Sequence, residues 1–445
     1  MSNPSKLDAL VAGGELSGFD ERLEVTSGPA SDIPAVMGLS QEAIRLPIDL
    51  DHLIGEQVAI SLWIYPNQDY RNGEGVATIA CNLLDIPGIA ALNFRQAPAA
   101  CALRWSWDSD HIEGVDAMAT NIPELPGQEW YHLLYTWDAD AGRFDAYLNG
   151  TPQRLPGTEI PPWHIEGWTQ LSISVGPFRY GAVTVEPRYM PPEEAEARDL
   201  RGYRGCRSDL LGRGDPGDPI DVDRRRGDLL YESTLGSEVE TEDWVLEGPG
   251  IVTFEEGWMK MASERPEGPE GHIVHWCPQD FPESYVAEWE IQPVSEDGLC
   301  IVFFSAKGEN GEDIFDPALA ERNGVFRQYT MGDIVSYHVS YYANTPFNPG
   351  RTASHLRKNN HFYLVDNGLP GIPPGSSDPH QVRVVKDGSH IQFLVDDRVI
   401  IDFVDDGRRY GPVHGGGKIG LRQMQWMVAR YRNLRVWQLK PIQHQ

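Results

Sequence analysis

The chain has 445 residues, of which 66 are Asp or Glu and 37 are Lys or Arg, so its formal charge is −29. The sequence contains no uncharged apolar run long enough to cross a membrane, and its negative charge repels nucleic acid, so neither is expected as a partner. Apolar residues make up 40% of the chain and can supply the cores of more than one domain. With 45 glycines, 34 prolines and 10% aromatic residues, the composition favours short β-strands joined by turns.

The start of the chain and its cysteines indicate a reducing compartment. The first residues lack the apolar segment of a secretion signal. The cysteines, Cys81, Cys101, Cys206, Cys277 and Cys300, are scattered and include no Cys-x-x-Cys pair. We therefore expect a cytoplasmic protein without a disulfide framework or a zinc ribbon.

The first block of predicted strands contains a hairpin. Residues 58–66 (VAISLWIYP) alternate as a half-buried strand does, and residues 130–150 are predicted to form strand, turn and strand, closing on a tight Asn149-Gly150 turn. A short acidic helix (PPEEAEARDL) is expected at 191–200. The hairpin and helix resemble those of a laminin-G-like, concanavalin-type jelly roll. The resemblance covers residues 20–205, after an N-terminal extension at 1–20, and implies a supporting or accessory binding role.

A stretch at 206–228, rich in charge, Gly and Pro, is predicted to connect this block to a second one at 229–440. The second block is predicted to contain strands at 286–294, 298–308 and 380–406, with hairpin turns at Lys386–Gly388 and Asp396–Asp397. The sequence thus predicts an all-β protein of two tandem antiparallel β-sandwiches, or jelly rolls, of the concanavalin A-like or laminin-G-like type.

The segment Arg322–Val365 carries the most informative side chains. Its five basic residues outnumber its one acidic residue, Asp333, although the whole chain is strongly acidic. Period two gives the strand expected at 335–342 two faces. One face holds Tyr337, Val339 and Tyr341, and the other holds Ser336, His338, Ser340 and Tyr342. The second face is polar throughout and predicts the floor of a wet groove.

Such a groove suits a carbohydrate. Sugar C–H faces stack on aromatic rings, while Asn, His, Arg and Tyr side chains hydrogen-bond the hydroxyl groups. Arginine adds a bidentate match to a carboxylate, so we expect an acidic oligosaccharide or polysaccharide as the ligand. No cofactor is predicted, and a structural calcium ion is left open, with oxygens from Asp313, Asp316, Glu255 or Glu256.

Two runs in this block carry a further resemblance, FRQYTMGDIVSYHVSYYAN (326–344) and LRKNNHFYLVDNG (356–368). They resemble a bacterial domain-of-unknown-function family of concanavalin-like jelly rolls, similar to proteins found with pectin (rhamnogalacturonan) and other polysaccharide-utilisation genes. The resemblance covers residues 229–440 and implies sugar chemistry or binding, without settled catalytic residues. Its motif positions in this chain are Arg327, Tyr329, His338, Tyr342, Asn344, Arg357, Lys358 and His361.

Three functions are compatible with these residues. The first is β-elimination on a uronate glycan, as in the jelly-roll polysaccharide lyases that the segment resembles in groove chemistry. Arg327, Arg357 and Lys358 would then neutralise the carboxylate, His338 would remove the C5 proton, and Tyr342 would protonate the leaving oxygen. The second is hydrolysis by carboxylates drawn from Glu288, Glu290 and Asp333. The third is a lectin-like protein that only binds.

An enzyme that cleaves glycosidic bonds is favoured over a lectin, with elimination ahead of hydrolysis. His, Tyr, Arg and Lys lie together in one segment, and a cytoplasmic protein meets imported oligosaccharides that need cleaving. The residues expected to bind the substrate are Tyr329, Asn344, Arg351, His355, Asn359 and His361.

Overall fold

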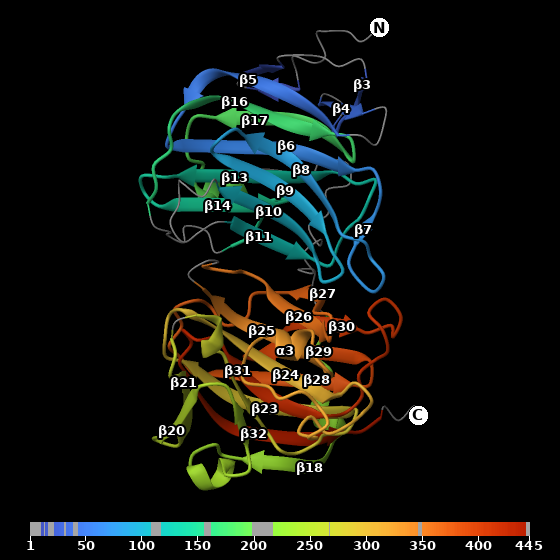
Figure 1. The fold of residues 1–445 in the computed structure, drawn as a ribbon, viewed down its shortest axis with the longest axis vertical. Coiled ribbons are helices and arrows are strands. Elements are labelled where there is room, and N and C mark those ends of the chain that lie inside the picture. The colour runs from blue at the N-terminus through green and yellow to red at the C-terminus, as the bar shows by residue number, and fades with distance from the viewer. Residues whose placement is uncertain are drawn as a thin grey trace. The chain divides into compact units, whose positions relative to one another are not determined.

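The computed structural model describes residues 10–12, 14–16, 22–30, 33–38, 43–107, 117–154, 162–197, 217–266, 268–345 and 349–441. Its contacts divide the chain into two compact units, Met1–Leu210 with Pro346–Thr352, and Leu211–Thr345 with Ala353–Gln445. Each unit contains two large β-sheets (Figure 1). The predicted all-β fold of two tandem sandwiches is confirmed.

The first unit holds two sheets and a short ribbon. In order, one sheet contains β15 (Thr151–Pro152), β14 (Arg143–Leu148), β13 (Tyr131–Asp138), β6 (Gln57–Pro66), β17 (Phe178–Glu186), β4 (Pro34–Gly38) and β3 (Leu23–Ser27), with β1 (Val11–Ala12) beside β17. The other contains β11 (Ala117–Ile122), β10 (Cys101–Trp107), β9 (Ala90–Gln96), β8 (Ile79–Ile86), β16 (Trp168–Val175), β5 (Ile44–Ile54) and β2 (Gly14–Leu16). The ribbon pairs β7 (Tyr70–Arg71) with β12 (Glu124–Leu125), and the expected acidic helix is α1 (Pro192–Glu196).

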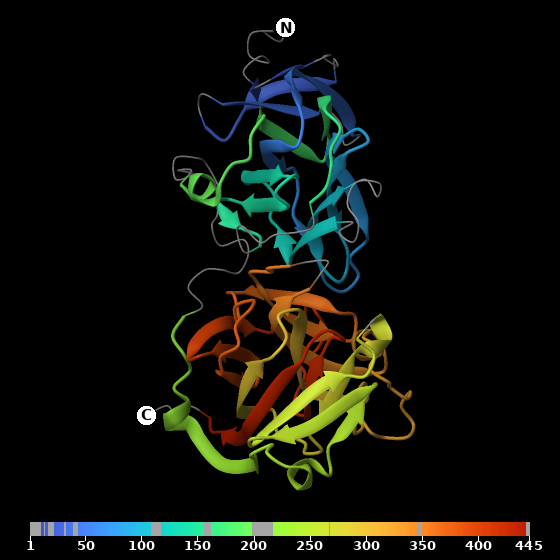
Figure 2. The ribbon, with the colours of Figure 1, turned by 90° about the vertical axis from the view of Figure 1, so that its left-hand side faces the viewer.

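The second unit has the same two-layer plan. The β32 sheet contains, in order, β20 (Gly250–Glu255), β21 (Trp258–Ser263), β32 (Ala429–Leu439), β23 (Ser284–Pro293), β28 (His380–Asp387), β29 (His390–Val395) and β30 (Arg398–Val404), with β18 (Arg226–Ser233) beside β32. The β25 sheet contains β19 (Val245–Glu247), β22 (Ile273–Trp276), β31 (Lys418–Gln423), β24 (Gly298–Gly308), β25 (Ile334–Asn344), β26 (Ser354–Asn359) and β27 (Tyr363–Gly368). Its helices are α2 (Val222–Arg225), α3 (Arg327–Thr330) and the 3-10 turns Glu238–Thr241 and Pro269–Gly271. Figure 2 shows the β20–β21 hairpin beside the C-terminal strand β32.

The predicted turns at Asn149-Gly150 and Asp396-Asp397 are confirmed, whereas Lys386 and Asp387 still belong to β28 and the turn after them lies at Gly388 and Ser389. Asn149 and Gly150 have φ angles of 50° and 74° and join β14 to β15. Asp396 and Asp397, with φ angles of 51° and 60°, join β29 to β30. Two consecutive residues at positive φ match the right-handed twist of the flanking strands, which explains why Asn, Asp and Gly occupy these positions.

Residues 206–216 of the predicted connector, with Cys206, lie outside the described residues. The rest of it is structured in part. Asp221 caps α2 by accepting a hydrogen bond from the Arg224 N–H at 3.1 Å, and β18 already begins at Arg226.

The core of the second unit lies between its two sheets. Tyr337, Val339 and Tyr341 of β25 point into it, as their alternation predicts, and the Tyr341 ring packs against Trp289 and Phe393 of the β32 sheet. The segment between β24 and β25 folds over the opposite, outer face of the β25 sheet, and its helix α3 lies against β25 (Figure 1). Among the described residues, no helix has the length and apolarity needed to cross a membrane.

Candidate functional site

A row of side chains crosses the outer face of the β25 sheet in direct register. Trp276 of β22 is level with Gly420 of β31, Gly420 with Phe303 of β24, Phe303 with His338 of β25, and His338 with Arg357 of β26. Cross-strand partners share a face of a sheet, so these groups are neighbours although they lie far apart in sequence.

Flanking positions extend the row. His355 is level with Ser340, and Asn359 is level with Ser336. The structure therefore brings together four of the predicted site residues, His338, Arg357, His355 and Asn359, on one face of the β25 sheet.

His338 is enclosed rather than open to solvent. Only 1% of it is exposed, and its Nδ1 atom lies 2.9 Å from Nδ2 of Asn359, which also donates to the Ser336 hydroxyl at 2.9 Å. The rings of Phe303, Phe326 and Phe362 surround the imidazole, with centroids 5.3, 5.8 and 5.7 Å away. The expectation of an open, wet groove floor is therefore wrong, because the segment between β24 and β25 covers this face.

Tyr342 does not share the face of His338, contrary to the period-two expectation. The ladder between β24 and β25 shifts register there, since Cys300 pairs with Tyr342 while Ile301 pairs with Ser340. The extra residue is a β-bulge, which turns the following side chain to the other face. Tyr342 consequently lies in the core, its hydroxyl donates to the Glu296 carbonyl, and burial raises its pKa to about 12.

Lys358 lies inside the sandwich, so its expected place in the groove is wrong. Its Nζ atom is 2.6 Å from Oδ2 of Asp405 and donates to the Gly411 carbonyl at 2.8 Å. The Tyr337 hydroxyl donates to the same carboxylate oxygen at 2.5 Å. Asp405 thus balances the lysine charge within the protein.

The other predicted residues are dispersed. Arg327 is exposed on α3, Tyr329 is buried in the covering segment, and the Asp333 carboxylate accepts a hydrogen bond from the Ala320 N–H at 2.6 Å. Asn344 donates to the Glu296 carbonyl at 3.3 Å, and His361 is exposed in the turn between β26 and β27. Arg351 belongs to the first unit by its contacts.

Glu288 and Glu290, the carboxylates considered for hydrolysis, are both engaged in cross-strand ion pairs of the β32 sheet. Glu288 lies 2.8 Å from Arg383 and 3.1 Å from Arg226, and Glu290 lies 2.5 Å from Arg432. This arrangement is what a solvent-facing strand with polar alternation produces.

The residues considered for calcium have other partners. Asp313 lies 2.8 Å from the Lys418 ammonium, and Asp316 accepts a hydrogen bond from the Ala318 N–H at 2.8 Å. Glu255 and Glu256 lie 3.6 and 3.9 Å from Arg430. Within the described ranges, no group of three or more His, Cys, Asp or Glu side chains is arranged to hold a metal ion.

The outer face also carries buried polar residues that the sequence did not single out. Glu247 accepts hydrogen bonds from the Trp276 indole and the Arg322 guanidinium, each at 2.8 Å. Burial, together with the charge of Glu247, raises the pKa of Tyr329 well above its usual range. Glu247 lies in β19, an edge strand of only three residues, and a strand this short shows no alternation from which its face could be predicted.

Arg422 and His272 form a second buried polar pair. The Arg422 Nη2 atom lies 2.6 Å from Nδ1 of His272, and burial together with the arginine charge lowers the pKa of His272 to about 3. Neither residue is among those predicted for the site. Period two on 418–423 places Arg422 on the outer face, which is the signal that could have found it.

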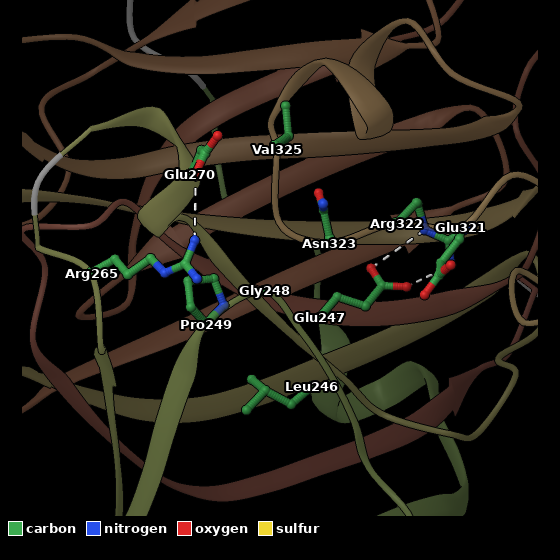
Figure 3. A pocket seen from close by; sticks show the side chains of 10 residues that line it. All are labelled: Leu246, Glu247, Gly248, Pro249, Arg265, Glu270, Glu321, Arg322, Asn323 and Val325. Carbon is green, nitrogen blue, oxygen red and sulfur yellow. Dashed lines mark hydrogen bonds and ion pairs between the residues drawn. The ribbon is translucent and has the colours of Figure 1, made fainter.

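A polar pocket opens beside these pairs. Its volume is about 480 Å³, and it lies between β19, the loop that joins β21 to β22, and the segment before α3. In Figure 3 the Arg265–Glu270 and Arg322–Glu247 pairs stand on opposite sides of the view, with Asn323 between them. The lining residues are Leu246, Glu247, Gly248, Pro249, Arg265, Glu270, Glu321, Arg322, Asn323 and Val325.

Comparisons with known proteins match the two units separately. Residues 228–436 match the model of the family described as "Domain of unknown function (DUF1961)", and residues 40–175 match that of the concanavalin A-like lectin/glucanases superfamily. The uncharacterized protein YesU of Bacillus subtilis (strain 168) is 37% identical over 218 residues, which are 48% of this chain and 97% of YesU.

Two solved structures are similar to part of the chain. A protein of unknown function with a galectin-like fold from Bacillus subtilis is 34% identical, with a TM-score of 0.45, over 49% of this chain and 99% of that one. The carbohydrate-binding module CBM66 from Bacillus subtilis is 12% identical, with a TM-score of 0.29, over 44% of this chain and 94% of that one.

Proposed function

Because the chain belongs to the DUF1961 family through residues 228–436, we propose that its second unit is a carbohydrate-binding sandwich whose ligand lies in the polar pocket beside β19. The observation that carries this proposal is the lining of that pocket, which combines carboxylate, guanidinium and amide side chains around about 480 Å³ of open space. Pockets for small ligands usually measure about 300–1,000 Å³.

The lining matches the hydrogen-bonding needs of a sugar. Each sugar hydroxyl both donates and accepts, so it is best met by acceptors such as Glu247 and Glu321 next to donors such as Arg265 and Asn323. Glu247 is held in place by Trp276 and Arg322, so one wall of the pocket is fixed before the ligand arrives. Pre-organised polar groups lose little freedom on binding, which favours affinity.

Cleavage of an acidic glycan is the second candidate, and the cross-strand pairing of His338 with Arg357 favours it. In an elimination, Arg357 would neutralise the uronate carboxylate and His338 would take the C5 proton. Both side chains are buried, so this chemistry would require the Phe326 and Phe362 rings to move aside. Tyr342 lies on the other face, so the leaving oxygen would need a different proton donor, such as water.

Calorimetric titration of the purified chain with a panel of neutral and uronate oligosaccharides tests the binding proposal. Asn323→Ala and Glu321→Gln are each expected to weaken binding at least tenfold, because the first removes an amide of the lining and the second replaces a carboxylate acceptor with an uncharged amide. Glu256→Gln is the matched control, an exposed carboxylate in the turn that follows β20. Failure of every glycan to bind, or equal effects of Glu321→Gln and Glu256→Gln, would contradict the proposal.

The same incubations test cleavage. Absorbance near 235 nm reports unsaturated products, and a reducing-end assay reports any bond cleavage. A rise in both indicates elimination, whereas new reducing ends alone indicate hydrolysis. Binding without either signal identifies the chain as a lectin-like protein and removes the catalytic candidate.

A further inference from the structure

Arg422 is a buried arginine whose charge is not balanced by any carboxylate of the described residues. Only 1% of it is exposed. The partners of its guanidinium are neutral: the His272 Nδ1 atom at 2.6 Å, the Gly324 carbonyl at 3.5 Å, and the ring of Phe326 at 4.2 Å. Its Nε atom has no hydrogen-bond partner, and burial lowers its pKa to about 9.

Arg322 shows what the ordinary arrangement would be. It is the other buried arginine beside this pocket, and Glu247 balances it through two hydrogen bonds, at 2.8 and 3.4 Å. The chain has 66 acidic residues to draw on, so an unbalanced arginine is not explained by a shortage of carboxylates. Buried charges in proteins are usually paired, and an exception calls for an explanation.

Phe326 occupies the position where a counter-charge would be expected. Its ring lies over the Arg422 guanidinium, and its edge approaches His338 and Phe362, with centroids 5.8 and 5.3 Å away. Phe362 in turn lies under the Arg357 guanidinium at 3.8 Å. Two aromatic rings therefore cover three nitrogen-bearing side chains, from strands β31, β25 and β26, on one face of the sheet.

A ring is a weaker partner for a guanidinium than a carboxylate is. The attraction between a cation and an aromatic face is electrostatic but spread over the ring, whereas a carboxylate carries a full charge and matches the planar fork with two parallel hydrogen bonds. Phe326 is also half-buried, and it follows Val325 and Asn323, which line the pocket. A displacement of this ring would free the covered face of the Arg422 guanidinium for the carboxylate of a ligand.

Resting on the proposed function, we infer that the Arg422 guanidinium recognises the carboxylate of a hexuronate residue in the bound glycan, and that this carboxylate replaces the Phe326 ring. The ligand class is then an acidic rather than a neutral sugar. The inference concerns Arg422 alone and does not depend on whether the glycan is cleaved.

The test compares two forms of the same ligand. Hexuronate oligosaccharides are titrated into the full chain next to the same oligosaccharides with each carboxyl group reduced to the alcohol. The uronate form is expected to bind at least tenfold more tightly than the reduced form. Arg422→Met is expected to bring the ratio of the two affinities towards one. Arg422→Lys keeps the positive charge but loses the planar guanidinium, so it is expected to give an intermediate ratio.

Stability without ligand separates this role from a structural one. Arg422→Met removes an unbalanced buried charge, so its melting temperature is expected to equal or exceed that of the parent. The matched variant Arg322→Met leaves the Glu247 carboxylate without its positively charged partner, so its melting temperature is expected to fall. If Arg422→Met does not fold, the ratio measured for Arg422→Lys decides the question.

Three results would overturn the inference. Equal affinity for the uronate and reduced forms would do so while leaving the proposed function standing. Arg422 variants that weaken both forms by the same factor would assign the arginine a structural role. Binding of neither form would remove the proposed function and the inference together.

Discussion

Glu247 holds the wall of the candidate pocket together. It accepts hydrogen bonds from Trp276 of the neighbouring strand and from Arg322 of the covering segment. The side chains of Arg322 and Glu247 are only 4% and 9% exposed, so the pair is screened little by water. A buried pair adds little over apolar packing, but it leaves an unbalanced charge when one partner is removed.

Glu247→Gln is therefore expected to lower the free energy of unfolding by about 3–5 kcal/mol. Glu270→Gln breaks the pair with Arg265, whose side chains are 75% and 65% exposed, and is expected to cost at most about 1 kcal/mol. Urea denaturation of the two variants beside the parent measures both effects. Equal losses would mean that the Arg322–Glu247 pair is hydrated as a surface pair is.

Buried neutral histidines give the second unit a dependence on pH. Burial lowers the pKa of His272 to about 3 and those of His275 and His414 to about 4, and nearby positive charges, Arg422 for His272 and Lys358 for His414, add to the effect. An unfolded chain binds protons at an ordinary pKa near 6.5, so between pH 4 and 6.5 it holds more protons than the folded one. The free energy of unfolding therefore falls as pH decreases through this window.

The expected loss is up to about 1.4 kcal/mol per histidine for each pH unit below 6.5. Urea denaturation at pH 7, 6 and 5 measures it, and His275→Gln is expected to reduce the slope, because it removes one of the groups that titrate. A stability that stays flat or rises as the pH drops to 5 would show that these histidines are accessible to protons in the folded protein.

At the scale of elements, β25 shows how far alternation carries a prediction. Period two puts Tyr337, Val339 and Tyr341 on one face of the strand, and that face packs in the core. It failed at Tyr342, because one extra residue in the ladder reverses the alternation, and a bulge leaves no mark in the residue types themselves. His338 and Arg357 are cross-strand partners and so share a face. Alternation within each strand cannot predict this pairing, because it does not give the register between two strands.

The cover over this face could not be predicted from local sequence. The segment Arg322–Val365 is rich in basic and aromatic residues, but the path of its first part, which leads into β25, depends on packing against distant strands. Tyr329 stacks on Phe303 at 5.6 Å, and Gly324 passes close to the His272 carbonyl. The residues predicted for an open groove are consequently buried beneath it, or lie within it.

Gly324 is expected to fix the path of the covering segment. Its φ is +94°, and a Cβ atom there would lie 2.0 Å from the His272 carbonyl oxygen. Gly324→Ala is expected to lower stability by more than the roughly 1 kcal/mol that positive φ alone imposes, because the segment must also move. Gly311, with a φ of +91° and no atom within 4 Å of its Cβ position, is the matched control.

Urea denaturation of Gly324→Ala and Gly311→Ala measures the loss of stability in each variant. Both variants place alanine at a positive φ, but only Gly324→Ala also brings its Cβ atom against the His272 carbonyl oxygen. The difference between them reports the cost of displacing the segment. Similar losses in the two variants would show that the segment yields freely at Gly324.

At the scale of the whole molecule, the two sandwiches have separate relatives. The 218 residues that match YesU cover 97% of that protein, so a sandwich of this kind exists without the first unit. The second unit here has its own core between its two sheets. We therefore expect residues 217–441 to fold on their own, with native near-ultraviolet circular dichroism and one cooperative calorimetric transition.

The boundary of that fragment can be tested sharply, because a start at residue 229 was expected from composition. A fragment of residues 229–441 would lack Val222, which packs in an apolar cluster with Val286, Val385 and Leu439. It would also lack Arg225, whose two hydrogen bonds to Asp387 measure 2.7 and 2.8 Å.

Burial of one valine contributes about 1.5–3 kcal/mol, and the partly buried ion pair adds to it. Fragment 229–441 is thus expected to be less stable than fragment 217–441 by about 2–4 kcal/mol in urea, and equal midpoints would place the boundary where the composition did.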